Sequence, residues 1–99
     1  MSAPETVHCR NPAPDKAGVN IPAWKFELVR GIILDELSNH PEGVLFKDMA
    51  GRVRSRLTTE QVRTLGSAAW HTTVVKLHLE AVSEIQRVPG TRPQLLRRA

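Results

Sequence analysis

Apolar residues recur along much of the chain at a spacing that predicts helices separated by short breaks. The first helix is expected over residues 21–39, because Asn20 and Pro22 form a helix-start signal. Its apolar residues fall on two neighbouring sides: Trp24, Leu28 and Ile32 on one, and Phe26, Val29, Ile33 and Leu37 on the other. An apolar arc this wide exceeds what one small core covers, so the pattern predicts a homodimer through helix 21–39.

Two shorter helices are expected in the middle of the chain. Residues 39–43 interrupt the first helix, and the apolar run Gly43–Phe46 predicts a short edge strand. A second helix over residues 47–57 is indicated by apolar residues at helical spacing: Phe46, Met49, Ala50, Val53 and Leu57. Thr58 resembles a helix cap, which predicts a short third helix ending at Gly66.

The last helix is expected over residues 67–82, with Ser67 as its N-cap. Turning each residue by about 100° gives two adjacent apolar rows. One row holds Val75, Leu79 and Val82, and the other holds Trp70, Val74, Leu77 and Ala81. The remaining side is narrow and mostly polar, and we expect it to stay open: Ala69, Thr72, Thr73, Lys76 and Glu80.

The two ends of the chain give different signals. Residues 1–19 are rich in Pro, Ala and small polar residues without periodicity, which predicts a flexible tail or an arm packed on the surface. Ordered structure is expected over residues 20–99. After the last helix, 85–88 and 94–98 predict two strands around a turn at residues 89–93, where Pro89-Gly90 and Pro93 stand.

Composition narrows the class of protein. The 99 residues carry 14 Lys and Arg against 10 Asp and Glu, a net charge of +4, which suits a polyanionic partner. The single cysteine, Cys9, cannot form an internal disulfide, and the N-terminus lacks the apolar stretch of a signal peptide. With no apolar run near the roughly 20 residues of a membrane span, we expect a cytoplasmic protein.

The order helix, strand, helix, short helix, helix, strand, turn, strand resembles a winged helix-turn-helix domain, mostly α with a small β-hairpin. The segment VKLHLEAVSEIQRVPG, residues 75–90, is similar to the junction of that family between a recognition helix and its wing, here 84–98. Two stretches, WHTTVVKLHLE and RVPGTRPQLLRR, look like a group of short bacterial winged-helix proteins with no assigned role. Ser83 stands where many winged helices carry a glycine, and residues 58–66 lengthen the usual turn.

This resemblance implies a regulator of transcription that binds double-stranded DNA, with helix 67–82 in the major groove and the wing on the backbone or in the minor groove. Arg and Lys would supply phosphate contacts, and Lys76 could reach a guanine edge. The candidate contacts on the helix are His71, Thr72, Thr73 and Lys76, and those elsewhere are Arg52, Arg56, Arg87, Arg92, Arg97 and Arg98. Arg54 points away from Arg52 and Arg56, and Glu80 and Glu84 would repel phosphate.

Other classes have weaker support. A winged-helix domain can instead be a protein-interaction or dimerisation module without DNA binding. His71 and His78 are seven residues apart, whereas a zinc pair on a helix needs four-residue spacing and a third ligand, so no metal site is expected. The sequence has no phosphate-binding glycine loop and no nucleophile motif. We therefore expect neither an enzyme nor a cofactor.

Overall fold

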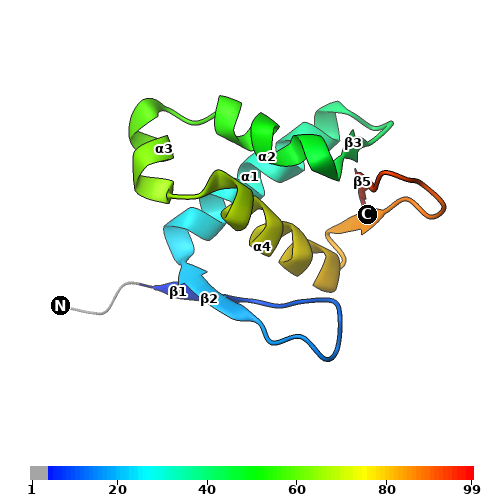
Figure 1. Cartoon of the computed structure of the whole chain (residues 1–99), viewed down its shortest axis with the longest axis horizontal. Coiled ribbons are helices and arrows are strands. Elements are labelled where there is room, and N and C mark those ends of the chain that lie inside the picture. Colours follow the sequence, from blue (N-terminus) through cyan, green and yellow to red (C-terminus); the bar gives the residue numbers. More distant parts are fainter. Residues whose placement is uncertain (1–4) are drawn as a thin grey trace.

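A computed structural model describes residues 5–99 of the chain as four helices and two small antiparallel sheets (Figure 1). In chain order the elements are β1 (Thr6–Cys9), β2 (Val19–Pro22), α1 (Ala23–Asn39), β3 (Val44–Leu45), α2 (Phe46–Ser55), α3 (Thr59–Leu65), α4 (Ala68–Ala81), β4 (Ile85–Arg87) and β5 (Leu95–Arg98). From residue 23 onward the expected order of helices and strands is therefore confirmed, with small shifts at the ends, whereas residues 20–22 belong to β2.

The starts of the helices show which sequence signals were sufficient to predict a helix cap. Thr58 caps α3 in a capping box, because its hydroxyl accepts from the Gln61 N–H while the Gln61 side chain accepts from the Thr58 N–H. Ser67 caps α4 by accepting from the Trp70 N–H at 3.0 Å. Both predicted caps are confirmed. Asn20 is not a cap, because it lies in β2, and α1 starts after Pro22 without a side-chain cap.

The end of α4 turns the chain into the second sheet. The Glu84 N–H bonds the Leu79 carbonyl and the Ser83 N–H bonds the Glu80 carbonyl, the pair of bonds that defines a Schellman motif. This motif needs a left-handed residue at its corner, and Ser83 supplies it with φ of 63°. A serine thus takes the conformation that glycine adopts most easily.

The C-terminal hairpin, residues 85–98, is the predicted pair of strands. β4 pairs with β5 so that Gln86 lies opposite Arg97, and β5 also pairs with β3, giving the strand order β3-β5-β4. Leu96 and Ile85 point into the core. Because side chains alternate along a strand, Gln86 and Arg97 lie on the opposite, outer face of this sheet.

The N-terminal region corrects the expectation of a structureless tail. β1 and β2 form an N-terminal hairpin, residues 6–22, in which Thr6 pairs with Pro22 and Cys9 with Val19. Cys9 and Ile21 are buried in the core, so this hairpin packs as part of the domain and crosses the expected boundary at residue 19. The alternative of an arm packed on the surface describes it better. Residues 1–4, also assigned to the tail, lie outside the described residues.

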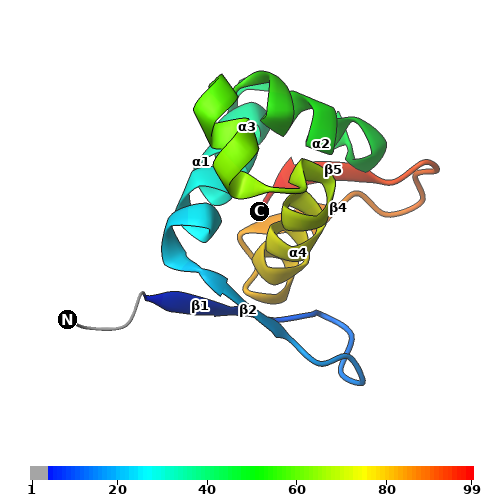
Figure 2. The same cartoon turned by 60° about the vertical axis from the view of Figure 1, so that its left-hand side comes forward.

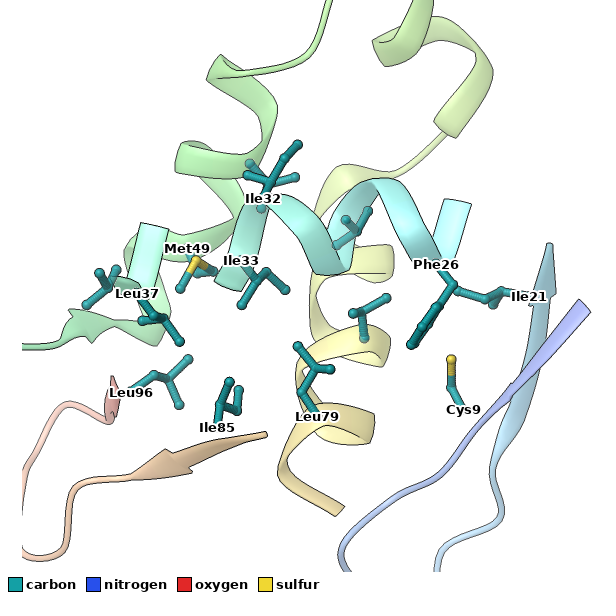
Figure 3. Packing of buried hydrophobic residues seen from close by; sticks show 14 of the residues in the cluster. Cys9, Ile21, Phe26, Ile32, Ile33, Leu37, Met49, Leu79, Ile85 and Leu96 are labelled. Atoms are coloured by element: carbon teal, nitrogen blue, oxygen red, sulfur yellow. The ribbon is translucent and has the colours of Figure 1, made fainter. Parts of the chain in front are cut away.

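One core joins both sheets to the helices (Figure 3). Its buried apolar residues include Phe26, Val29, Ile32, Ile33 and Leu37 of α1, and Leu28 and Leu34 pack against it half-buried. The wide apolar arc of α1 is therefore covered within the single chain, by α2, α4 and the strands, and Trp24 is the large apolar residue of α1 that stays exposed, at 48%. The reason given for the homodimer is thus wrong, and the homodimer itself stays a prediction. Across residues 5–99 no helix has the length and apolarity needed to cross a membrane.

Candidate nucleic-acid interface

The side of α4 that carries Lys76 faces the protein, not solvent. Lys76 is 2% exposed and its Nζ lies 4.5 Å from the centre of the Phe46 ring, at the start of α2. The expectation that this side of the helix is open is therefore wrong for Thr72 and Lys76, which are buried, whereas Ala69 and Thr73 are exposed. A long aliphatic stem lets Lys76 pack against α2 as an apolar residue would, while its charged end finds a partner nearby.

That partner is Glu80, one turn further along α4. Lys76 Nζ lies 3.0 Å from Glu80 Oε1, and Arg87 Nε donates to the same oxygen at 3.0 Å. Burial lowers the pKa of Lys76, against the opposing effect of the hydrogen bond and charge of Glu80. Two candidate DNA contacts, Lys76 and Arg87, are thus engaged by one carboxylate that ties α4 to β4.

The next two candidates on α4 are also buried. Thr72 is fully buried, and in the described part of the chain its Oγ1 has no hydrogen-bond partner. His71 is 7% exposed, with Nδ1 2.7 Å from the Ser67 carbonyl oxygen and its ring edge-on to Trp70. Neither side chain is available to a nucleic acid, so their assignment as contacts is corrected.

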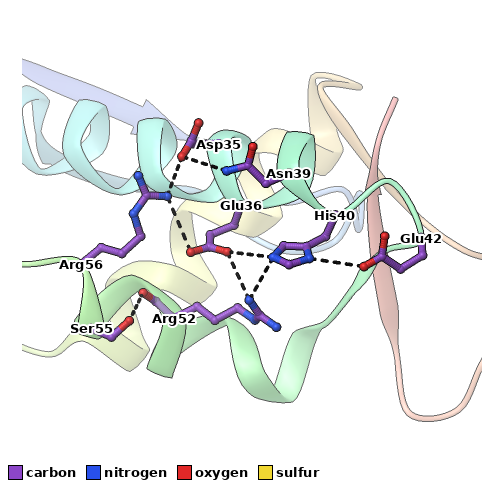
Figure 4. A network of polar contacts seen from close by, with 8 residues as sticks. All are labelled: Asp35, Glu36, Asn39, His40, Glu42, Arg52, Ser55 and Arg56. Atoms are coloured by element: carbon purple, nitrogen blue, oxygen red, sulfur yellow. Dashed lines mark hydrogen bonds and ion pairs between the residues drawn. The ribbon is translucent and has the colours of Figure 1, made fainter.

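Arg52 and Arg56 are held by the acidic end of α1 (Figure 4). Arg52 Nη1 lies 3.2 Å from Glu36 Oε2, and Arg56 Nη1 lies 2.8 Å from Asp35 Oδ2. His40 also approaches Glu36, at 3.6 Å. These contacts fasten α2 to α1, and they neutralise both arginines on a side of α2 that faces α1.

Four of the predicted contacts are exposed and form no ion pair among residues 5–99, whereas Arg56 and Arg87 are exposed but ion-paired. Thr73 lies on the solvent side of α4, while Arg92, Arg97 and Arg98 lie on the C-terminal hairpin. Arg98 donates to the Ser38 hydroxyl at 2.8 Å, and Arg97 points from the outer face of the sheet. Arg92 stands in the turn between the strands, where it forms no ion pair with any residue from 5 to 99.

A hollow that the sequence did not indicate lies between α2, α3 and the start of α4. Its volume is about 400 Å³, and small residues line most of it: Ala50, Gly51, Gly66, Ser67, Ala68 and Ala69, with Val62 and Arg54. A neighbouring hollow shares Gly51, Arg54 and Val62 and adds Arg63. The hollow therefore combines small side chains with the cation Arg54.

Arg54 and Lys47 are the exposed cations of α2 that sequence reasoning missed. Together with Gly51 they follow helical spacing of four and then three residues, which puts them on one side of the helix. This spacing is a signal that could have identified them. Arg54 was set aside because it points away from Arg52 and Arg56, and the same orientation leaves it in solvent.

Gly51, Arg54 and Ala69 line one hollow. Lys47 and Thr73 are exposed one helical turn from Gly51 and Ala69, and we call these five residues the α2–α4 surface. Arg92 stands on the turn of the adjacent C-terminal hairpin. Asp48 is exposed on α2 as well, so the surface is cationic but not uniformly so. In the described chain, no three His, Cys, Asp or Glu residues lie close enough together to hold a metal ion.

Comparison with known proteins adds a family but no described activity. A family model described as a family of unknown function (DUF6958) matches residues 6–96. No curated protein and no solved structure matches the chain. The matched span includes the N-terminal hairpin, all four helices and the C-terminal hairpin up to Leu96. The chain therefore belongs to the family of unknown function DUF6958.

Proposed function

We propose that this protein is a winged helix-turn-helix domain that binds double-stranded DNA and regulates transcription without catalysis, in the cytoplasm. The arrangement of α1, β3, α2, α4 and the C-terminal hairpin supports this proposal, because α4 runs directly into β4 as a recognition helix runs into its wing. The short helix α3 lies between α2 and α4 and does not cover the exposed side chain of Thr73.

The contact set is revised to the α2–α4 surface and Arg92. Phosphate contacts give most of the affinity for DNA, and they require cations that are not already neutralised. Arg54 and Lys47 on α2 and Arg92 on the C-terminal hairpin are exposed and form no ion pair across residues 5–99, which satisfies this requirement. The observation that carries the proposal is the exposure of Arg54 beside the open start of α4.

Close approach to a DNA strand also requires small side chains. Gly51 and Ala69 border the hollow, and a Cβ added at Gly51 would meet no heavy atom within 4 Å. On α4, Thr73 is the exposed polar side chain able to contact a phosphate or a thymine methyl. Because Lys76 is buried, we expect little base-specific readout and a large backbone component.

The test is a titration of labelled duplex DNA at several salt concentrations. The wild-type protein should lose affinity steeply with salt, and R54A/R92A should reduce the slope of log K against log salt by about 1.8, since each phosphate contact contributes about 0.9. The matched control is R52A/R56A, which removes the same formal charge from arginines that already face Glu36 and Asp35. A wild-type affinity that does not change with salt would refute the proposal.

A second function, a protein-interaction module that forms a homodimer, is favoured by one observation. Trp24 at the start of α1 and Trp70 at the start of α4 are 48% and 47% exposed. Tryptophan side chains are enriched at interfaces between proteins, so two exposed tryptophans favour a surface that a second copy of the protein covers. Sedimentation of wild type and W24A/W70A distinguishes the two functions. A wild-type dimer that W24A/W70A converts to monomer, together with no binding of DNA, would support the interaction module.

A further inference from the structure

The N-terminal hairpin lies along α4 on a different side from α2 (Figure 2). Cys9, Gly18 and Val19 of the hairpin and Val74 and Leu77 of α4 enclose a small hollow of about 60 Å³. Lys76, by contrast, points toward Phe46 of α2. Since residues 74 and 76 are about 200° apart around a helix, α4 lies between α2 and the N-terminal hairpin.

One hydrogen bond fixes where the loop of this hairpin begins. The Arg10 backbone N–H donates to His78 Nδ1 at 2.9 Å, and the His78 ring packs edge-on against Phe26 with centroids 5.3 Å apart. Burial and, to a smaller extent, the charge of Arg10 lower the pKa of His78, which keeps Nδ1 an acceptor at neutral pH. Residues 10–18, which we call the arm loop, therefore start at a defined place on the second half of α4.

The arm loop presents two cations next to the C-terminal hairpin. Arg10 and Lys16 are exposed, and neither forms an ion pair within the described chain; Asp15 is the acidic residue of this loop. Pro12 of the loop shares a hollow of about 330 Å³ with Glu80 and Arg87. The two hairpins thus flank the end of α4, and their loops project to the same side in Figures 1 and 2.

We propose that the arm loop is a second cationic ribbon that contacts the phosphates of the same DNA duplex through Arg10 and Lys16. The inference rests on the proposed DNA binding. A helix in the major groove has one phosphate backbone on each side. α2 offers Lys47 and Arg54 to one backbone, and the arm loop lies on the flank of α4 where cations could reach the other.

The side chains of Arg10 and Lys16 can contact DNA without disturbing the attachment of the hairpin to the domain. It is the backbone of Arg10, not its guanidinium, that bonds His78, so the side chain is free to interact outward. The buried anchor of the hairpin is Cys9 together with Ile21. Changing Arg10 and Lys16 to glutamine therefore leaves the attachment of the hairpin in place.

The first measurement compares salt slopes for duplex binding. R10Q/K16Q should reduce the slope of the wild-type protein by about 1.8, the value for two phosphate contacts, and the equal removal of charge in R52A/R56A should reduce it by much less. If wild type binds with a salt-dependent affinity but the slopes of wild type and R10Q/K16Q coincide, the arm loop makes no contact. If wild type does not bind DNA, the proposed function itself fails.

The second measurement locates the loop directly. Because Cys9 is buried, a cysteine introduced as K16C can be labelled selectively with a photo-crosslinker. Irradiation with duplex DNA should crosslink K16C and R92C, and it should not crosslink E27C, an exposed position on α1, which lies behind α4 in Figure 1. Crosslinking of R92C without K16C would overturn the arm inference and leave the proposed function standing.

Discussion

The two regions that sequence resemblance assigns to DNA, α4 and the C-terminal hairpin, present their cations in opposite ways. On α4, Lys76 is buried against Phe46 and paired with Glu80. On the hairpin turn, Arg92 is exposed, and none of residues 5–99 forms an ion pair with it. The comparison shows that a cation in the expected position is available to DNA only if it is neither paired with a nearby carboxylate nor buried against another element.

Arg87 lies between these two cases and links them. It belongs to the hairpin, yet its guanidinium reaches back to Glu80 at the end of α4. Glu80 therefore forms an ion pair with Lys76 of α4 and another with Arg87 of the C-terminal hairpin, and the second pair connects β4 to α4. What resembles a continuous basic surface in the sequence is divided here into a structural ion-pair cluster and an exposed turn.

The largest effect is expected at Lys76. K76A should lower the free energy of unfolding by about 3 kcal/mol, because it removes one member of a buried ion pair and leaves Glu80 with less compensation. Chemical denaturation measures this loss, with K47A as the control for an exposed lysine that should leave the midpoint unchanged. A K76A protein as stable as wild type would mean that Lys76 is in solvent, and would return it to the list of DNA contacts.

A gain of stability is expected at Thr72. Its buried hydroxyl lacks a partner among the described residues, and an unsatisfied buried polar group is costly. T72V keeps the shape and removes the hydroxyl, so it should raise the free energy of unfolding by about 1 kcal/mol. DNA affinity should stay unchanged, and a loss of affinity at equal stability would show that this hydroxyl faces the nucleic acid after all.

Ser83 joins α4 to the C-terminal hairpin, and its backbone conformation can be tested by substitution. Because Ser83 adopts a left-handed φ of 63°, S83G should relieve strain and stabilise the protein by up to about 1 kcal/mol. Thermal unfolding should show a higher midpoint for S83G than for wild type, whereas S83A retains a Cβ and should show no gain. Equal midpoints for S83G and S83A would argue against the left-handed corner.

The smallest effect on stability is expected within the hairpin itself, where two exposed arginines can be compared. R92A and R97A should both leave the unfolding midpoint unchanged. Only R92A should reduce the salt slope of DNA binding, by about 0.9, because Arg97 points from the outer face of the sheet. Equal salt slopes of DNA binding for R92A and R97A would show that the turn and the outer face of the sheet do not differ in their contact with DNA.

Local signals predicted most of the elements because their causes are local. Thr58 and Ser67 cap α3 and α4 through bonds to residues three positions ahead, and the Pro-Gly turn separates two short strands. The N-terminal hairpin escaped prediction because residues 1–19 show no apolar periodicity, so no local signal marks β1 as a strand. Its stability depends on burying Cys9 and Ile21 against helices that come later in the chain.

By itself, the sequence determined where the helices and the C-terminal hairpin lie and that the protein is cationic. Tertiary structure alone decided which of these cations are exposed and unpaired, and so available to a nucleic acid. Helical spacing gives the angle between side chains but not which neighbour covers them, and Lys76 has an aliphatic stem that packs as well as an apolar residue. Ion pairs such as those of Arg52 with Glu36 and Arg87 with Glu80 join residues from different elements, so they exist only once the helices and strands have packed.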